Sequence, residues 1–126
     1  MNWYQNLYIG ETFLQKKKRI MRMVDAQKAV PHLYLILLRT DVEQNQLEVV
    51  PQRCLENTIP DLSSAVILGI ASGKREAKEL LVRMTEQVYE ETQTADLRTY
   101  FLARVYSERQ NSFVNCKGCT QTRGSV

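Results

Sequence analysis

The stretch Leu62-Ser63-Ser64-Ala65-Val66-Ile67-Leu68-Gly69-Ile70-Ala71-Ser72-Gly73 runs directly into Lys74-Arg75-Glu76-Ala77-Lys78-Glu79-Leu80-Leu81. Residues 65–71 are an uncharged, apolar run of strand length that is closed by serine and glycine. Because the run is continuous and does not alternate with polar residues, we expect a strand covered on both faces. Apolar residues then recur at three- and four-residue steps to about residue 89, which predicts one long amphipathic helix.

The other elements are predicted by the same patterns. Residues 33–38 form a second continuous apolar run, and the short alternating stretch 47–50 is typical of an edge strand. We expect further helices over residues 11–29, over residues 52–57, and from about residue 96. The predicted order is α-β-β-α-β-α-α, an α+β fold in which about four helices pack on a small three-stranded mixed or antiparallel sheet.

The unbroken hydrophobicity of residues 33–38 places this strand in the middle of the expected sheet, in the order 2-1-3. The third strand then runs antiparallel to the first, and a parallel arrangement of these two strands is the alternative. We expect one α+β domain over residues 1–109, with residues 1–9 as an aromatic N-terminal arm. The polar composition of residues 110–126 predicts a flexible tail.

Composition and charge are those of an ordinary soluble domain. The chain has 126 residues, of which 44% are hydrophobic and 25% are charged, and its net charge is +3. No apolar run approaches the roughly 20 residues that span a bilayer, so we expect no membrane association. Three cysteines, an odd number, do not make a disulfide framework and favour the reducing cytoplasm.

The first expected helix, residues 11–29, is the most basic segment of the chain. Five of its residues are candidate contacts for nucleic acid or for an acidic partner: Lys16, Lys17, Lys18, Arg19 and Arg22. The alternative is a solvated face, which the small net charge favours. No zinc-finger or RNA-recognition motif accompanies the basic residues, so nucleic acid is not the favoured partner.

The turn after residues 65–71 resembles a phosphate-binding loop without matching it. Three residues separate Gly69 from Gly73, where the motif has four, and Arg75 stands in place of the magnesium-binding hydroxyl. We therefore interpret it as a structural turn that leads into a helix. Helix N-termini attract anions, so Lys74 and Arg75 are candidate anion contacts.

The remaining reactive residues do not form a recognisable site. Cys116 and Cys119 have the spacing of half a zinc knuckle or of a redox pair, but Cys54 and His32 are far away in the sequence. We expect free thiols and no cofactor, with zinc shared between two chains as the alternative. No serine or cysteine lies beside His32, and no paired carboxylates are spaced for acid–base chemistry, so we predict no catalytic residues.

One further pattern covers about residues 32–102. It consists of Leu68-Gly69-Ile70-Ala71-Ser72-Gly73, Glu76-Ala77, Leu80-Leu81, Val88-Tyr89 and Asp96-Leu97-Arg98-Thr99-Tyr100-Phe101. In these residues the chain resembles small uncharacterised bacterial proteins, some of them encoded near mobile elements. The resemblance implies no activity and no binding residues.

These observations together predict a small cytoplasmic accessory protein that binds an unknown protein partner and is not an enzyme. The alternative is a nucleic-acid-binding accessory protein that uses the basic helix 11–29. A metal or redox protein built on the cysteine pair is a third hypothesis. A homodimer is one way to cover a sheet of only three strands.

Overall fold

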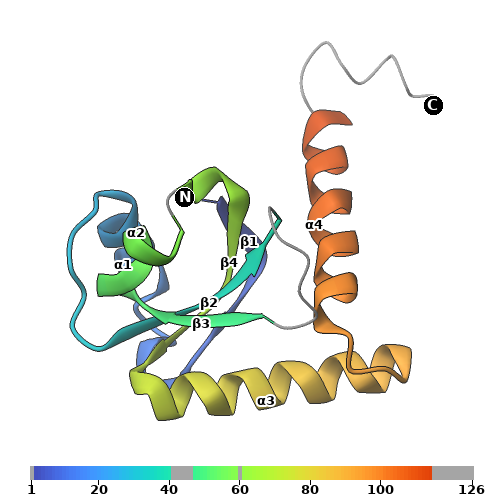
Figure 1. Cartoon of the computed structure of the whole chain (residues 1–126), viewed down its shortest axis with the longest axis horizontal. Helices are drawn as coiled ribbons and strands as arrows, with labels where there is room; N and C mark the ends of the chain where they lie inside the picture. The colour runs from blue at the N-terminus through green and yellow to red at the C-terminus, as the bar shows by residue number, and fades with distance from the viewer. Residues whose placement is uncertain (1, 41–46, 60, 115–126) are drawn as a thin grey trace.

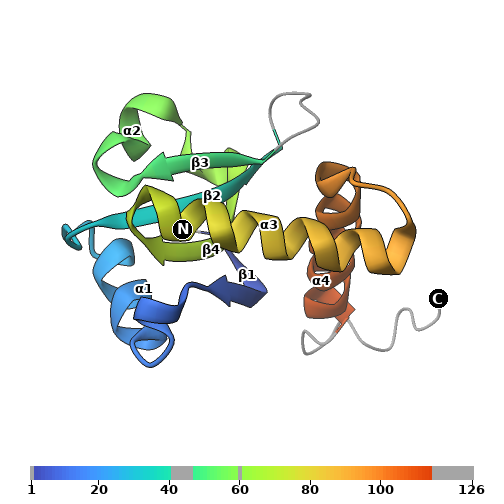
Figure 2. The same cartoon turned by 90° about the horizontal axis from the view of Figure 1, so that it is seen from below.

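The computed structural model describes residues 2–40, 47–59 and 61–114, which form one sheet with helices on both faces (Figures 1 and 2). The strands are β1 Asn2–Ile9, β2 Leu33–Arg39, β3 Glu48–Pro51 and β4 Ala65–Ser72. The α-helices are α1 Lys17–Asp25, α2 Leu55–Thr58, α3 Gly73–Thr92 and α4 Leu97–Val114. Short 3-10 turns at Glu11–Phe13, Gln52–Cys54 and Leu62–Ser64 precede α1, α2 and β4.

The sheet is mixed and its strand order is β1-β4-β2-β3. Strand β1 is parallel to β4, and β2 is antiparallel to both of its neighbours. The α+β class is confirmed, but the expected sheet of three strands in the order 2-1-3 is wrong. The three expected strands are β2, β3 and β4, and they keep β2 between the other two; β1 adds a fourth strand beside β4.

Residues 2–9, expected as an arm, are a strand of this sheet. Their two apolar groups, around Trp3 and Tyr8, pair with β4, and the register of this pairing shifts between Trp3 and Tyr8. Tyr4 and Leu7 are buried on opposite faces of the sheet. Because this strand has apolar residues on both faces and they are interrupted in the middle, its sequence does not alternate between apolar and polar residues. The strand was not predicted for this reason.

The strand that decides the fold is buried along almost its whole length. Every residue of β4 except Ser72 is buried, as the continuous apolar run predicts. The pairing of β4 with β2 shifts by one residue at Leu68, which forms a bulge. At Gly69 beside it, an added Cβ would lie 3.2 Å from Leu80 Cδ2 and 3.3 Å from the Tyr8 carbonyl oxygen, so this close approach favours glycine.

Each face of the sheet has its own apolar core. Helices α3 and α4 cover one face, where α3 contributes the predicted stripe Ala77, Leu80, Met84 and Val88. On this face α4 contributes Leu97, Phe101 and Val105. Helices α1 and α2 cover the other face, together with Phe13 from the first 3-10 turn.

The expected boundaries of one helix are wrong. The helix expected over residues 11–29 is limited to Lys17–Asp25, because Glu11–Phe13 form a separate 3-10 turn and Gln27 adopts a left-handed conformation, with φ of 60°. The tail expected from residue 110 begins inside α4, which continues to Val114. Residues 115–126, including Cys116 and Cys119, lie outside the described residues.

Candidate functional site

The basic residues of α1 lie on its outer face. The helix packs on the sheet through Ile20 and Val24, which are buried at i,i+4 spacing. The side chains of Lys16, Lys18, Arg19 and Arg22 are exposed, and Lys17 is half-buried. Within the described part of the chain, none of these five side chains makes an ion pair or a side-chain hydrogen bond. Their charges are therefore available to a partner.

The start of α1 is an unfavourable place for these charges. A helix N-terminus carries a partial positive charge, which is stabilised by acidic residues and by side-chain caps. The first turn of α1 contains Lys17, Lys18 and Arg19, has no acidic residue, and begins at Lys16 without a side-chain cap. The helix dipole does not account for this cluster of lysines and arginines.

The turn between β4 and α3 has its own internal anion. The Glu76 carboxylate accepts hydrogen bonds from the Ser72 N–H (2.7 Å) and from the Thr12 hydroxyl (2.7 Å) and N–H (3.3 Å). Desolvation raises the pKa of Glu76, but the bonds from Ser72 and Thr12 outweigh it and lower the pKa overall. The Gly73 N–H donates to the His32 carbonyl oxygen at 2.7 Å. The N–H groups of Ser72 and Gly73, two of those that line this turn, are thus already used.

The two candidate anion contacts at this turn differ in their surroundings. Arg75 pairs with Glu79 at 3.4 Å, and both side chains are largely exposed. Lys74 is exposed and, among the described residues, makes no ion pair. Of the two cations, Lys74 is therefore the one that has no ion-pair partner among the described residues.

The fold brings the two basic segments to the same end of the molecule. Helix α1 and the first turn of α3 lie at the left in both views (Figures 1 and 2). The Thr12–Glu76 hydrogen bonds join the chain just before α1 to the start of α3. We call these seven residues the basic end: Lys16, Lys17, Lys18, Arg19, Arg22, Lys74 and Arg75.

The opposite end of α3 is acidic. Helix α3 runs along the molecule from the basic end to the start of α4 (Figure 1). Its last turns carry Glu86, Glu90 and Glu91, all exposed, and no basic residue. The chain has 17 lysines and arginines against 14 acidic residues, so without the five basic residues 16–22 it would be net negative. The charges of α3 are therefore polarised along the helix.

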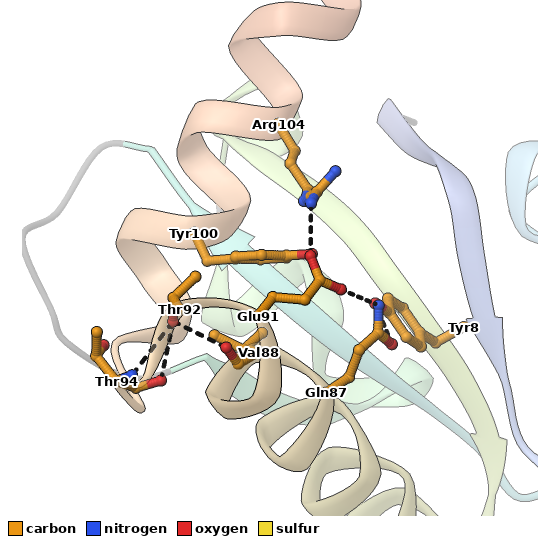
Figure 3. A network of polar contacts seen from close by, with 8 residues as sticks. All are labelled: Tyr8, Gln87, Val88, Glu91, Thr92, Thr94, Tyr100 and Arg104. Carbon is orange, nitrogen blue, oxygen red and sulfur yellow. Dashed lines mark hydrogen bonds and ion pairs between the residues drawn. The ribbon is translucent and has the colours of Figure 1, made fainter.

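A polar network that the sequence did not predict joins β1, α3 and α4 near this acidic end (Figure 3). Glu91 Oε1 accepts hydrogen bonds from the Tyr100 hydroxyl (2.8 Å) and from Arg104 (2.9 Å). Gln87 donates to Glu91 Oε2 at 3.2 Å and accepts the Tyr8 hydroxyl at 3.0 Å. The guanidinium carbon of Arg104 also lies 4.3 Å from the Tyr100 ring centroid, in a cation–π contact.

Aromatic rings pack against the residues of this network. Phe101 makes edge-to-face contacts with Tyr4, Tyr8 and Tyr100, at centroid distances of 5.5, 5.8 and 4.9 Å. Burial raises the pKa of Tyr8 and Tyr100, and the Tyr100 hydroxyl is the main cause of a lowered pKa at Glu91. A cavity of about 510 Å³ lies over these groups. Because the polar groups bond to one another, we interpret the network as a brace between three elements.

The described residues contain no recognised metal centre. No group of three or more His, Cys, Asp or Glu residues in this part of the chain could hold a metal ion. Cys54 is half-buried and free, and His32 is exposed in the turn before β2. The cysteine pair at 116 and 119, and the zinc alternative with it, falls outside the described residues.

Comparisons with known proteins found no relative. No protein-family model matches the chain, and neither the curated proteins nor the solved structures contain a match. None of the described helices is long and apolar enough to cross a membrane.

Proposed function

We propose that this chain is a cytoplasmic accessory protein without catalytic activity, which binds an acidic surface of a partner protein through its basic end. One observation supports the proposal more than any other: the positive charge is concentrated on outward-facing side chains at a helix start, where it does not stabilise the fold. Surface charge of this kind increases association rates and selects partners of complementary potential.

A protein partner fits the basic end better than a long polyanion. Helix α1 has nine residues, and so it presents a face only about 14 Å long. Glu76 and Glu79 lie among the basic residues, and the far end of α3 is acidic. A nucleic acid extending past the basic end would meet this negative charge, whereas a compact acidic patch would not.

The test compares two variants of equal net charge. In Lys18→Gln/Arg19→Gln/Arg22→Gln the basic end is weakened. In the control Lys28→Gln/Lys78→Gln/Arg83→Gln, three other exposed basic residues are neutralised. Each tagged protein is purified from its native cells at low salt, with and without nuclease. We expect a stoichiometric partner protein with the wild type and the control, resistant to nuclease and absent from the first variant. Loss from both variants, or from neither, would contradict the proposal.

The second candidate function is nucleic-acid binding through the same residues. It is favoured by the five α1 side chains that have no ion-pair partner within the described structure. Phosphate contacts release counterions, so the logarithm of the affinity falls with the logarithm of the salt concentration, with a slope of about −0.9 per contact. Neutralising Lys18, Arg19 and Arg22 should then reduce the slope for duplex DNA by roughly 2–3. A slope that is equal in the wild type and this variant would exclude the second candidate.

A further inference from the structure

A second cavity lies on the other face of the sheet, between the segment that follows α1 and the segment that contains α2. Its volume is about 410 Å³, at the small end of the roughly 300–1,000 Å³ typical of ligand pockets. Its apolar lining includes Val24, Leu33 and Leu55, which are buried. Five polar residues also line it: Gln27, His32, Gln52, Arg53 and Glu56.

The wall of this cavity is held in place by Gln52. The Gln52 side chain accepts a hydrogen bond from the Val30 N–H and donates one to the Lys28 carbonyl oxygen, both at 2.8 Å. The segment after α1 is therefore tied to the segment before α2 through two backbone groups. A cavity fixed in this way is largely preformed, which reduces the ordering cost of binding.

His32 occupies a position that would favour glycine. The Leu33 N–H bonds to the Val30 carbonyl oxygen at 3.2 Å, Pro31 follows Val30, and His32 has φ of 64°. This arrangement is typical of a type II turn, whose third residue is usually glycine because φ is positive. Gln27, also on the cavity lining, has φ of 60°. A histidine is therefore less favourable for the backbone at this turn than a glycine would be.

Apart from Gln52, the polar side chains of this cavity differ from those in Figure 3. In the described structure, the side chains of Gln27, His32, Arg53 and Glu56 make no hydrogen bond or ion pair with other protein groups. The groups over Phe101, in contrast, bond to one another. Donors and acceptors beside a buried apolar surface, without protein partners, are suited to contact a ligand.

We propose that this cavity binds a free α-amino acid with an apolar side chain. Arg53 and Glu56 are three residues apart in a helical segment, so they project from the same side and carry opposite charges. The guanidinium of Arg53 binds the carboxylate, assisted by the His32 imidazole, and Glu56 binds the ammonium group. The surface of Val24, Leu33 and Leu55 accepts the apolar side chain.

Calorimetric titration with leucine and two of its analogues tests each part of this assignment. The analogue 4-methylpentanoate lacks the ammonium group, and isopentylamine lacks the carboxylate. We expect saturable binding of leucine and at least tenfold weaker binding of either analogue. Arg53→Gln should weaken leucine binding at least tenfold, and Glu56→Gln should abolish the preference for leucine over 4-methylpentanoate. Both positions are exposed, and thermal unfolding confirms that the variants fold.

His32→Gly and Gln93→Gly provide a matched pair. Gln93, at the end of α3, has φ of 62° but does not line this cavity. Each substitution places glycine at a position with positive φ, a conformation that glycine adopts without strain. Both substitutions should therefore raise the melting temperature of the protein. Only His32→Gly should weaken leucine binding. No saturable binding of leucine up to about 10 mM, a very weak affinity, would overturn the assignment. Equal binding of leucine and 4-methylpentanoate by the wild type would overturn it as well.

Discussion

Glu76 connects the start of α3 to the chain before α1 through its contacts with Ser72 and Thr12. Gly10 lies beside it, so closely that an added Cβ would overlap Glu76 Oε2. The backbone of Gly10, with φ of −65° and ψ of 156°, is open to any residue, so the close contact alone requires glycine. We predict that Gly10→Ala lowers the free energy of unfolding by about 1–3 kcal/mol, because the carboxylate must move.

Urea titration of a double-mutant cycle measures this contact. In the Glu76→Ala background the obstructing carboxylate is absent, so Gly10→Ala should have little further effect. If the two substitutions lowered the free energy of unfolding additively, the contact between Gly10 and Glu76 would not be the cause of the loss in Gly10→Ala.

The lowered pKa of Glu76 also predicts how its contribution depends on pH. Because its folded pKa lies below the ordinary value of 4.5, the ionised carboxylate stabilises the fold above that pH. The contribution is lost as the pH falls through the folded value. We expect the difference in unfolding free energy between the wild type and Glu76→Gln to be constant near neutral pH and to shrink in acid. Exposed Glu86→Gln is the control, and a difference that grows in acid would contradict the assignment.

At the scale of elements, the two inner strands, β2 and β4, contribute side chains to both apolar cores. Leu35 of β2 and Ile67 of β4 are fully buried, with exposed fractions of 0%. We predict that Leu35→Ala or Ile67→Ala lowers the free energy of unfolding by about 2–5 kcal/mol, through lost burial and the cavity left behind. Val82→Ala, on the outer face of α3 where the side chain is 55% exposed, should change it by less than about 0.5 kcal/mol. Equal midpoints for all three variants in denaturant would contradict these strand positions.

The elements that could be predicted are those whose own sequence determines their burial. Strands β2 and β4 are continuous apolar runs, and α3 has an apolar stripe. The sequence of each element alone therefore indicates which of its faces are buried. Strand β1 gave no such pattern, because the polar residues Gln5 and Asn6 interrupt its apolar residues, within the part of the strand where the register with β4 shifts. The end of α1 at Asp25 was missed because no glycine or proline marks it; Gln27 takes the left-handed position instead.

The candidate sites follow the same rule. The basic face of α1 is a property of one short segment, and composition was enough to identify it. The cavity with His32, Arg53 and Glu56, and the network of Tyr8 with Glu91 and Arg104, each combine separate segments of the chain. Within a single segment, the sequence signal of these sites is the spacing of Arg53 with Glu56 and of Tyr100 with Arg104. Such spacing is common on helices and therefore does not identify a site.

At the scale of the whole molecule, most charges at the two ends of α3 have the sign that opposes the helix dipole, and Glu76 in the first turn is the exception. Lys74 and Arg75 lie at the N-terminal end, and Glu90 and Glu91 lie at the C-terminal end. Each such charge at a surface costs about 0.3–1 kcal/mol relative to the opposite sign. The binding role proposed for the basic end offers a reason for charges that oppose stability. Natural proteins often lose stability where a surface serves function.

This interpretation predicts that stability and binding separate at Lys74. Lys74→Glu should raise the free energy of unfolding by about 0.3–1 kcal/mol at low salt, because it complements the helix dipole and lies four residues before Lys78. It should also weaken binding of the partner isolated by the nuclease-resistant purification. Glu90→Lys, in the last turn, should give a similar gain in stability and leave partner binding unchanged. Urea titrations at low and high salt check the electrostatic origin, since salt screens both gains. If Lys74→Glu destabilised the protein, or bound the partner as well as Glu90→Lys does, the polarity of α3 would have another cause.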